Sequence, residues 1–473
     1  MREELEEDAV LVLDCGSTNV RAIAVSKSGK VIARATEKNA TFSEPGHEDW
    51  HYWSFEGLCE KLFRCARQVT DTISAKRIRA VTVTTFGGDG TFLSASGDLI
   101  YPVISWKCTR TIESQTHMER YIDPHRVTEI SGVGHFSFNT LNKFIWFREH
   151  HPEILHNARH FLFVSSLFTH RLTGRLSNDA TLVGTSQMTD LKTQDFSEEI
   201  LDAVGIDASL FPETIFPGEV VGPLLKESAD AMGLLSGTPV ISAGHDTQFA
   251  IFGAGATPEQ PVLSSGTWEI LMARCPSIDI PSKEFFEEPF TCEWDVCKGY
   301  FNPGYQYVAS AVIEWFARLL YPGLSGAELY ESMIREAMAA PEDCNGVIID
   351  PDMLVGRGVI SGLSLDVDRG ILLRATLNGM VTRLKKGLAI LEQVGNFKAS
   401  QLTMVGGGTR NQFWTQLKAN ALGIPINVLD EPETTVLGAS MFALTGAGLY
   451  ASADEARDAF SPPCHVIMPQ DKN

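Results

Sequence analysis

The sequence predicts an α/β protein made of two related halves with a cleft between them. Apolar runs typical of strands alternate with helical patterns along the whole chain. The order strand, turn rich in hydroxyl residues, strand opens the chain and returns from residue 261, which indicates an internal repeat. Small residues at 253–256 precede two prolines, so we place a boundary there and predict domains at residues 1–254 and 255–473.

The composition is that of a folded protein with a large core. Of 473 residues, 44% are hydrophobic and 21% are charged, which is ordinary for a globular chain. The formal net charge of −20 argues against a general nucleic-acid binder and against docking on an anionic membrane, because both need a basic surface. We therefore expect no nucleic-acid partner and no membrane partner, and any anionic ligand needs a local source of positive charge.

The cysteines and the N-terminal segment favour a cytoplasmic location. The nine cysteines are scattered and include no CxxC pair, so free thiols in a reducing compartment are favoured over a metal site. The acidic start of the chain is unlike the basic start of a secretory signal, and no apolar run reaches transmembrane length. The sequence leaves self-association open.

In the first half, short apolar runs bounded by turn residues predict strands, and longer patterns with helical spacing predict helices. The expected strands lie at residues 9–13, 20–25, 30–35, 79–85 and 239–243, and the expected helices at 141–149 and 153–174. The last of these strands leads into Gly244-His245-Asp246, so that a carboxylate follows a buried strand near the domain boundary.

The second half has the same kind of organisation. Its expected strands lie at residues 261–263, 270–273, 402–405 and 425–429. An amphipathic helix is predicted from apolar residues at helical spacing, namely Val308, Val312, Trp315, Phe316 and Leu319. A helix after residue 411 ends at Gly423 and Pro425, and a helix of small residues at 435–444 is expected to close this domain.

Two turns have the residues that an anion site needs. The turn at 14–19 offers backbone N–H groups and the side chains of Ser17, Thr18 and Asn19, and the turn at 264–267 offers a second set. Alone, either segment is more often a plain turn. If the halves are related by a rough two-fold axis, both turns face one cleft and can hold a polyphosphate from two sides. No Walker P-loop pattern occurs.

Gly406-Gly407-Gly408 follows an expected strand and precedes a helix. Glycines permit close approach of the backbone, so an adenosine could lie against this loop, although a helix cap or a plain turn is the alternative interpretation. A dinucleotide fingerprint would need glycine at position 411, where Asn411 stands. The loop therefore argues against a nicotinamide-dependent dehydrogenase.

Asp246 is the candidate general base. Its position after a buried strand would let it accept the proton of a substrate hydroxyl during phosphoryl transfer. The alternative is a helix-capping carboxylate, and His245 could equally be a hydrogen-bonded core histidine. Asp89, Trp106, Lys107 and Arg110 combine a carboxylate, an aromatic face and two cations, a set suited to a sugar.

Taken together, these segments resemble the FGGY family of carbohydrate kinases over nearly the whole chain. Phe138 to Trp146 matches a family signature, aromatic-x-[PST]-x-x-K-x-x-W. The two turns, the Gly244-His245-Asp246 segment and the glycine loop occur along the chain in the order expected for the family. Stretches such as VTTFGGDG (83–90) and PVLSSGTWEILM (261–272) are most similar to family members that act on L-fuculose. Departures occur at 370–371 and 378–379, where the usual Gly-His and Glu-Gly are absent.

The resemblance implies a fold, an activity and a set of site residues. The fold is that of actin, hexokinase and the heat-shock ATPases, with two ribonuclease-H-like domains. The activity is transfer of phosphate from ATP to O1 of a ketose, with Mg²⁺ held by Asp14 and with Asp246 as base. The implied phosphate contacts are Ser17, Thr18, Asn19, Arg21, Gly266 and Thr267, the adenosine contacts are Gly407, Gly408 and Asn411, and the sugar contacts are Asp89, Trp106, Arg110, Phe138 and His245.

Two alternatives stay open at this point. One is a kinase for another ketose such as rhamnulose, xylulose or ribulose, because the shape of the sugar pocket decides which of several similar ketoses is accepted. The other is a non-catalytic ATP-binding module of the same fold, which would hydrolyse ATP slowly without stimulation by sugar. Asp246 and the sugar-side residues argue against the second alternative.

Overall fold

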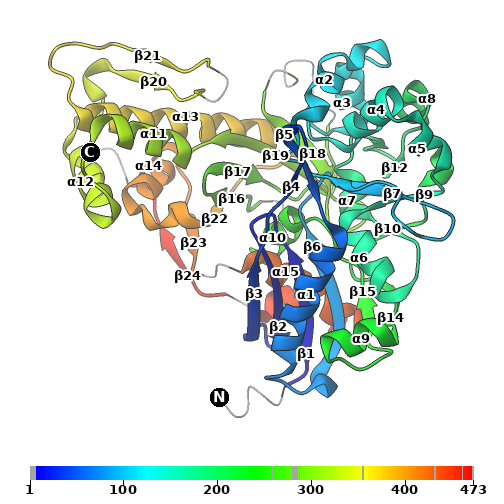
Figure 1. Ribbon diagram of the computed structural model, residues 1–473. Coiled ribbons are helices and arrows are strands. Elements are labelled where there is room, and N and C mark those ends of the chain that lie inside the picture. Colours follow the sequence, from blue (N-terminus) through cyan, green and yellow to red (C-terminus); the bar gives the residue numbers. More distant parts are fainter. Residues whose placement is uncertain are drawn as a thin grey trace.

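The computed structural model describes residues 7–257, 259–279, 286, 288–353, 356–430, 433–460 and 462–470. The chain forms two lobes, each with a central sheet covered by helices (Figure 1). The lobes follow the two halves of the sequence, with one exception described below. The two-domain α/β architecture that the sequence predicts is therefore confirmed, while the boundary between residues 254 and 255 stays a prediction.

The first sheet has six strands. Their spatial order is β14 (Val220–Pro223), β15 (Pro239–Ile241), β6 (Ile78–Thr85), β1 (Ala9–Cys15), β2 (Asn19–Ser26) and β3 (Val31–Lys38). β1 pairs antiparallel with β2 and parallel with β6. All seven residues of β1 are buried, as expected for the central strand of a sheet with both faces covered.

The second sheet repeats this arrangement. Its order is β18 (Phe290–Trp294), β19 (Phe301–Val308), β17 (Trp268–Met272), β16 (Val262–Ser265), β22 (Leu402–Val405), β23 (Ile426–Leu429) and β24 (Cys464–Ile467). β16 pairs antiparallel with β17 and parallel with β22, just as β1 pairs with β2 and β6. The internal repeat is therefore confirmed, and so is every strand that the sequence predicts.

Helices cover both sheets. In the first half these are α1 (Phe55–Thr70), α2 (Ile112–Thr116), α3 (Pro124–Ser131), α4 (Thr140–His150), α5 (Pro152–Asn157), α6 (Val164–Thr173), α7 (Ala180–Gly184), α8 (Glu198–Val204), α9 (Lys226–Met232) and α10 (Asp246–Gly253). In the second half they are α11 (Ser310–Leu320), α12 (Gly326–Ala339), α13 (Arg369–Gly395), α14 (Gln412–Leu422), α15 (Thr434–Gly446) and α16 (Ala453–Phe460).

Short strands complete the fold around the main sheets. They are β4 (Phe42–Glu44), β5 (His47–Trp53) and β8 (Val103–Ile104), then β7 (Gly90–Leu93) with β9 (His160–Phe163), β10 (Asn178–Asp179) with β13 (Thr214–Ile215), β11 (Thr189–Asp190) with β12 (Asp195–Phe196), and β20 (Ile348–Asp350) with β21 (Val359–Ser361). The expected helix at 153–174 is thus wrong in part, because β9 interrupts it. The apolar run of β9 pairs antiparallel with β7, and the helical pattern resumes only at residue 164.

The helix of small residues, α15, lies on the first sheet and does not close the second domain as expected. Its side chains pack with Val10 and Val12 of β1 in one buried cluster, and it lies against α10 (Figure 1). Residues 436–444 of α15 are all buried. A helix that is apolar on all sides needs partners on all sides, and the groove between α10 and the first sheet supplies them.

The predicted amphipathic helix exists as α11, but the apolar pattern extends beyond its buried face. Val312 and Phe316 are buried, whereas Trp315 is 38% and Leu319 is 57% exposed. Val308 belongs to β19. Part of the apolar stripe therefore faces solvent.

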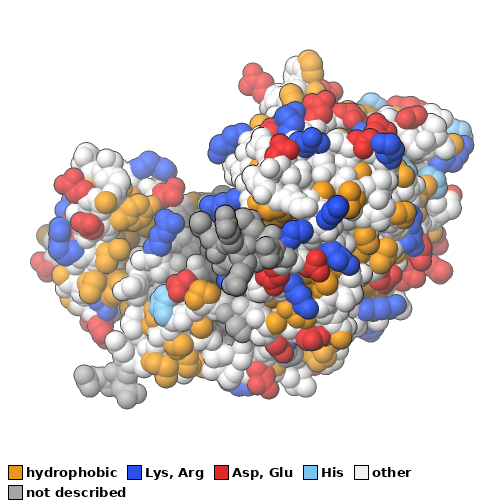
Figure 2. Space-filling view, turned by 90° about the horizontal axis from the view of Figure 1, so that it is seen from below, with side chains coloured by type: hydrophobic (Ala, Val, Ile, Leu, Met, Phe, Trp, Pro, Cys, Tyr) orange, Lys and Arg blue, Asp and Glu red, His pale blue; other side chains and the backbone are white. Residues whose placement is uncertain are grey.

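The surface seen in Figure 2 mixes both signs of charge. Lysine and arginine side chains alternate with aspartate and glutamate over the visible face, with hydrophobic side chains between them. Among the described residues, no helix has the length and apolar character that spanning a membrane requires.

Candidate active site

A cavity of about 360 Å³ lies between the two halves. The first half contributes Ser17, Trp106, Phe138, His245 and Asp246 to its wall, and the second half contributes Thr291, Glu293 and Gln306. The first predicted phosphate turn, the predicted base and part of the predicted sugar set therefore meet in one place, although they are far apart along the chain.

Asp246 is the first residue of α10, and residues 242–245 connect it to the end of β15. His245, and not Asp246, occupies the capping position of this helix, so the alternative role as a capping carboxylate does not apply. The side chain of Asp246 is 34% exposed and faces the cavity. Burial raises the pKa of Asp246, the negative charge of Asp14 raises it further, and His245 opposes the shift. A carboxylate with a raised pKa is suited to accept a proton.

The first turn joins β1 to β2, and its ends are fixed by the pairing of Asp14 with Arg21 across the hairpin. Ser17 reaches the cavity, Thr18 is exposed and Asn19 begins β2. One carboxylate oxygen of Asp14 accepts a hydrogen bond from Thr84 Oγ1 at 3.1 Å. The other accepts from Arg21 Nε at 2.8 Å.

Arg21 does not point freely toward a phosphate. Its guanidinium lies 2.6 Å from Asp14 Oδ2 and 2.7 Å from Glu433 Oε2. Burial lowers the pKa of Arg21, but the ion pairs with Asp14 and Glu433 outweigh it and raise the pKa. In this conformation two carboxylates of the protein itself neutralise Arg21, which links β2 to the start of α15.

The second turn, between β16 and β17, approaches Asp246 from the other side. A smaller cavity of about 210 Å³ is lined by Ser264, Thr247 and Asp246 together. Gly266 donates its N–H to the carbonyl of Trp268 at 2.9 Å, and Thr267 accepts from Ala309 N–H at 2.9 Å. Ser264, at the end of β16, thus borders a cavity together with Asp246, whereas Gly266 and Thr267 line neither of these two cavities.

The glycine loop lies against the second turn. Gly406 has a φ of +93°, a value that favours glycine, and a Cβ on Gly408 would lie 2.0 Å from Ser265 Oγ, whereas a Cβ on Gly407 would meet nothing within 4 Å. Asn411 caps α14, because its Oδ1 accepts a hydrogen bond from Trp414 N–H at 3.0 Å. The contact between the loop and Ser265 brings the predicted adenosine segment next to the predicted phosphate turn.

This pair of glycines allows a matched test of packing. Gly408→Ala is expected to lower the free energy of unfolding by about 1–3 kcal/mol, because the added methyl group overpacks Ser265. Gly407→Ala, which adds the same methyl group into open space, is expected to change the stability by less than about 1 kcal/mol. Urea denaturation of the two variants measures the difference, and equal stability would contradict the described contact.

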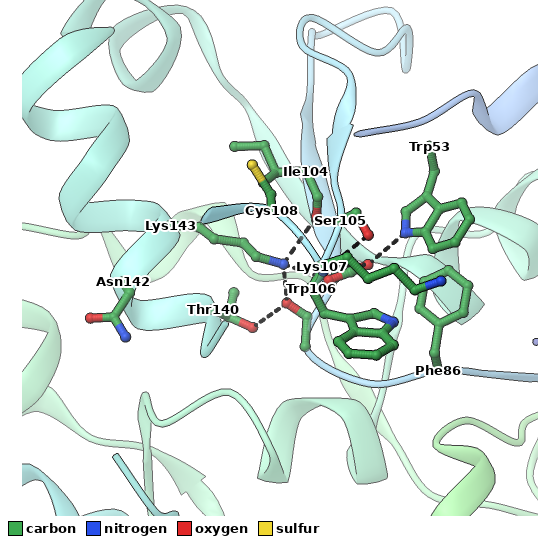
Figure 3. Close-up of polar contacts among 12 residues, drawn as sticks. Trp53, Phe86, Ile104, Ser105, Trp106, Lys107, Cys108, Thr140, Asn142 and Lys143 are labelled. Carbon is green, nitrogen blue, oxygen red and sulfur yellow. Dashed lines mark hydrogen bonds and ion pairs between the residues drawn. The ribbon is translucent and has the colours of Figure 1, made fainter. Parts of the chain in front are cut away.

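Asp89 lies behind the cavity wall, where it is fully buried. It accepts hydrogen bonds from Trp53 Nε1 at 2.8 Å and from Trp106 N–H at 3.1 Å. Its other oxygen is 2.5 Å from Lys143 Nζ. Figure 3 shows Lys143 extending from α4, with a hydrogen bond from its Nζ to the carbonyl of Ile104 at 3.0 Å. Asp89 is therefore not placed to contact a sugar as predicted, because both of its carboxylate oxygens already accept hydrogen bonds from the protein, including those from Trp106 and Lys143.

Arg110 is likewise away from the cavity. Its guanidinium lies between the rings of Trp50 and Trp146, 4.7 and 5.0 Å from their centroids, and it donates to Glu44 Oε2 at 3.2 Å. Its side chain is 1% exposed. The predicted sugar contact by Arg110 is not seen because stacking on two indoles holds the side chain inside the first half. Lys143 and Trp146 of the family signature therefore contact Asp89 and Arg110.

Aromatic rings form one wall of the cavity. The ring of Phe138 is stacked on that of Phe136 with centroids 5.2 Å apart, and Trp106 lies edge-on to Phe138 at 6.4 Å. All three side chains line the cavity. Trp106 and Phe138 therefore lie where the sequence places a sugar, while Phe136 was not predicted.

The contribution of the second half to this cavity was also missed. Thr291 and Glu293 lie on β18, and Gln306 lies on β19. No motif surrounds them in the sequence, and the strand of Glu293 had not been predicted. The only local signal is the alternation of apolar and polar residues in FTCEW (290–294), which agrees with the lower burial of residues 291 and 293 in β18.

Comparison with known proteins gives consistent results for the whole chain. The family model for the FGGY family of carbohydrate kinases matches with its N-terminal domain at residues 9–253 and with its C-terminal domain at residues 262–447. L-fuculokinase from Escherichia coli (strain K12) is 46% identical over 467 residues, and L-fuculokinase from Salmonella typhi is 45% identical over 467 residues. In both cases the match covers 98% of this chain and 98% of the relative.

A solved structure agrees with the fold. The crystal structure of xylulose kinase from Rhodospirillum rubrum superposes with a TM-score of 0.89 at 21% identity, covering 98% of this chain and 94% of the other. Its low identity makes it evidence for the fold alone. With two matching family domains and relatives of such high identity, the chain belongs to the FGGY family of carbohydrate kinases.

Proposed function

We propose that this protein transfers the γ-phosphoryl group of ATP to O1 of L-fuculose. The observation that carries the proposal is the single cavity that joins the first phosphate turn, Asp246 and the aromatic wall. The identity of 45–46% to L-fuculokinases over nearly the full chain supports the choice of sugar. Xylulose kinases and a rhamnulokinase are only 24–26% identical.

The reaction needs a base beside the ketose and donors around the phosphates. Asp246 would accept the proton of the O1 hydroxyl as the phosphoryl group is transferred. The two turns would hold the phosphate oxygens with backbone N–H groups and with the hydroxyls of Ser17, Thr18 and Thr267. The adenosine would lie along Gly407, Gly408 and Asn411, next to the second turn. Burial of the ketose between the halves would exclude water and limit hydrolysis of ATP.

The residues fit a magnesium ion that is bound to the protein through its coordinated water molecules. Among the described residues, no cluster of three or more carboxylate, histidine or cysteine side chains could form a protein cage for a metal. Mg²⁺ usually keeps several waters and binds one or two carboxylates plus substrate phosphates. Asp14, whose oxygens already accept from Thr84 and Arg21, would hold it in this indirect way. The bound ion would offset phosphate charge in this acidic protein.

The wall of the cavity suits a 6-deoxy sugar. Phe136, Phe138 and Trp106 offer an apolar surface to a methyl group, and Thr291, Glu293 and Gln306 offer polar partners to hydroxyl groups. L-tagatose differs from L-fuculose only by a hydroxyl in place of a hydrogen at C6. We therefore assign the methyl group of L-fuculose to the aromatic wall.

A panel of ketoses tests the proposal. We expect kcat/KM for L-fuculose to exceed that for L-tagatose by about 10- to 100-fold, because a hydroxyl set against an apolar surface is disfavoured to this extent. L-rhamnulose, xylulose and ribulose are expected to be poorer substrates than L-fuculose. A coupled assay of ADP formation measures all five. A higher kcat/KM for another ketose would reassign the substrate, and ATP hydrolysis that no ketose stimulates would indicate a non-catalytic module.

The proposed reaction also suggests a location. ATP is supplied in the cytoplasm, and the cysteines of the described residues are free thiols, which suit a reducing compartment. We therefore place the enzyme in the cytoplasm.

A further inference from the structure

β18 belongs to the second sheet but is docked on the first half. Cys292 donates its N–H to the carbonyl of Gly132 at 2.8 Å, and Gly134 donates its N–H to Thr291 Oγ1 at 3.2 Å. The ring of Trp294 packs so closely on Gly184 that a Cβ there would lie 2.5 Å from it. Because side chains alternate along a strand, this docking directs Glu293 into the cavity between the halves.

Glu293 meets two residues of the first half. Its Oε2 accepts a hydrogen bond from Gln248 Nε2 and lies 3.7 Å from His245 Nδ1. On the other side of the ring, His245 Nε2 lies 3.5 Å from Asp246 Oδ1. His245 is thus placed between the carboxylate of the proposed base and a carboxylate from the second half. The ring is held against Gly87, where a Cβ would lie 2.5 Å from Nε2.

This group of side chains is incompletely hydrogen-bonded. A separation of 3.7 Å is too long for a hydrogen bond, and His245 Nδ1 and Gln248 Oε1 are buried without a partner among the described residues. Buried polar atoms are usually satisfied, and His245 and Glu293 line the cavity that the ketose would occupy. The side chain of Glu293 is 13% exposed, so little water competes for it.

We propose that Glu293 is a ketose-binding residue, supplied by the second half, whose carboxylate accepts a hydrogen bond from one hydroxyl of the sugar. Gln248 holds the carboxylate, and His245 lies beside it. The carboxylate can only accept and the sugar hydroxyl can donate, so the pair is complementary. This inference rests on the proposed function, because it assumes that a ketose occupies the cavity.

The test is the isosteric variant Glu293→Gln. The variant loses the negative charge and one of the two acceptor oxygens, so the KM and the Kd for L-fuculose are expected to rise about 10- to 100-fold. The kcat is expected to change less than about threefold and the KM for ATP less than about twofold, since the residue touches neither the reacting atoms nor the nucleotide. Glu342→Gln is the matched control, because this glutamate of the second half is 87% exposed and lies outside the cavity.

Deoxy analogues identify the hydroxyl. With L-fuculose deoxygenated in turn at C3, C4 and C5, one analogue is expected to bind the wild type and Glu293→Gln with equal Kd, measured by calorimetry without ATP. Glu293→Asp, which keeps the charge, is expected to recover part of the affinity and serves if the first variant does not fold. An unchanged Kd in Glu293→Gln, or the same loss with all three analogues, would overturn the proposal.

The failure of this inference differs from a failure of the proposed function. If the wild type phosphorylates another ketose but not L-fuculose, the substrate is reassigned and Glu293 is tested in the same way with that ketose. If the wild type phosphorylates L-fuculose and Glu293→Gln binds it normally, only the role of Glu293 is wrong.

Discussion

Replacement of Asp246 with Asn is expected to lower kcat about 10²- to 10⁴-fold, the range that a general base contributes. Asn has the same shape, so the start of α10 and the cavity should be kept, and the Kd for ATP should change little. The measurement is steady-state kinetics with L-fuculose together with calorimetric binding of ATP. Asp230→Asn is the control, because Asp230 forms an ion pair on the surface. Near-normal turnover by Asp246→Asn would show that another group removes the proton.

The pH dependence of the wild type tests the same assignment. Burial raises the pKa of Asp246 from its ordinary value of 3.8. Below its pKa the carboxyl group holds a proton and cannot accept another, so kcat/KM is expected to fall with decreasing pH at a higher pH than for an ordinary aspartate. If the residual activity of Asp246→Asn no longer falls at low pH, the fall seen in the wild type is due to protonation of Asp246.

Replacement of Lys143 with Met is expected to lower the free energy of unfolding by about 3–5 kcal/mol, because it leaves the buried carboxylate of Asp89 without a counter-charge. The side chains of this pair are 3% and 0% exposed. Asp89 also holds Trp106 N–H, so we expect the KM for the ketose to rise as the aromatic wall shifts. Urea denaturation and steady-state kinetics measure the two effects.

Two further variants separate the buried charge from the lost side chain. The double variant Asp89→Asn with Lys143→Met removes both charges and should recover part of the stability, since an amide still accepts from the tryptophans. Lys226→Met removes a surface pair with Asp230 and should cost less than about 1 kcal/mol. A double variant no more stable than Lys143→Met would mean that packing of the lysine, and not charge, is what matters.

The strands and the motifs at their ends could be predicted because their signals are local. The apolar run of β1, the turn with Ser17 and the carboxylate after the β15 segment each occupy a few consecutive residues. Once the repeat placed the two turns on one cleft, the sequence alone led to the grouping of Ser17 with Asp246. Their roles in the reaction stay predictions.

The direction of polar side chains could not be predicted in the same way. Asp89 and Arg110 are residue types that often bind sugars. Their directions are set by their partners Lys143 and Trp146, which lie on a different element. Glu293 has no local motif, and its position depends on a contact between Cys292 and Gly132 that are distant in sequence. An all-apolar helix such as α15 has no polar face to indicate its orientation.

The position of α15 has a consequence for dividing the protein. A fragment that stops at residue 254 would lack this helix and leave Val10, Val12 and Ile23 of its sheet uncovered, since these residues share one buried cluster with Val436 and Phe442. The complementary fragment would carry a hydrophobic helix with nothing to cover it. Co-expressed pieces cut between α10 and β16 should therefore associate as a non-covalent complex, and each piece alone should aggregate.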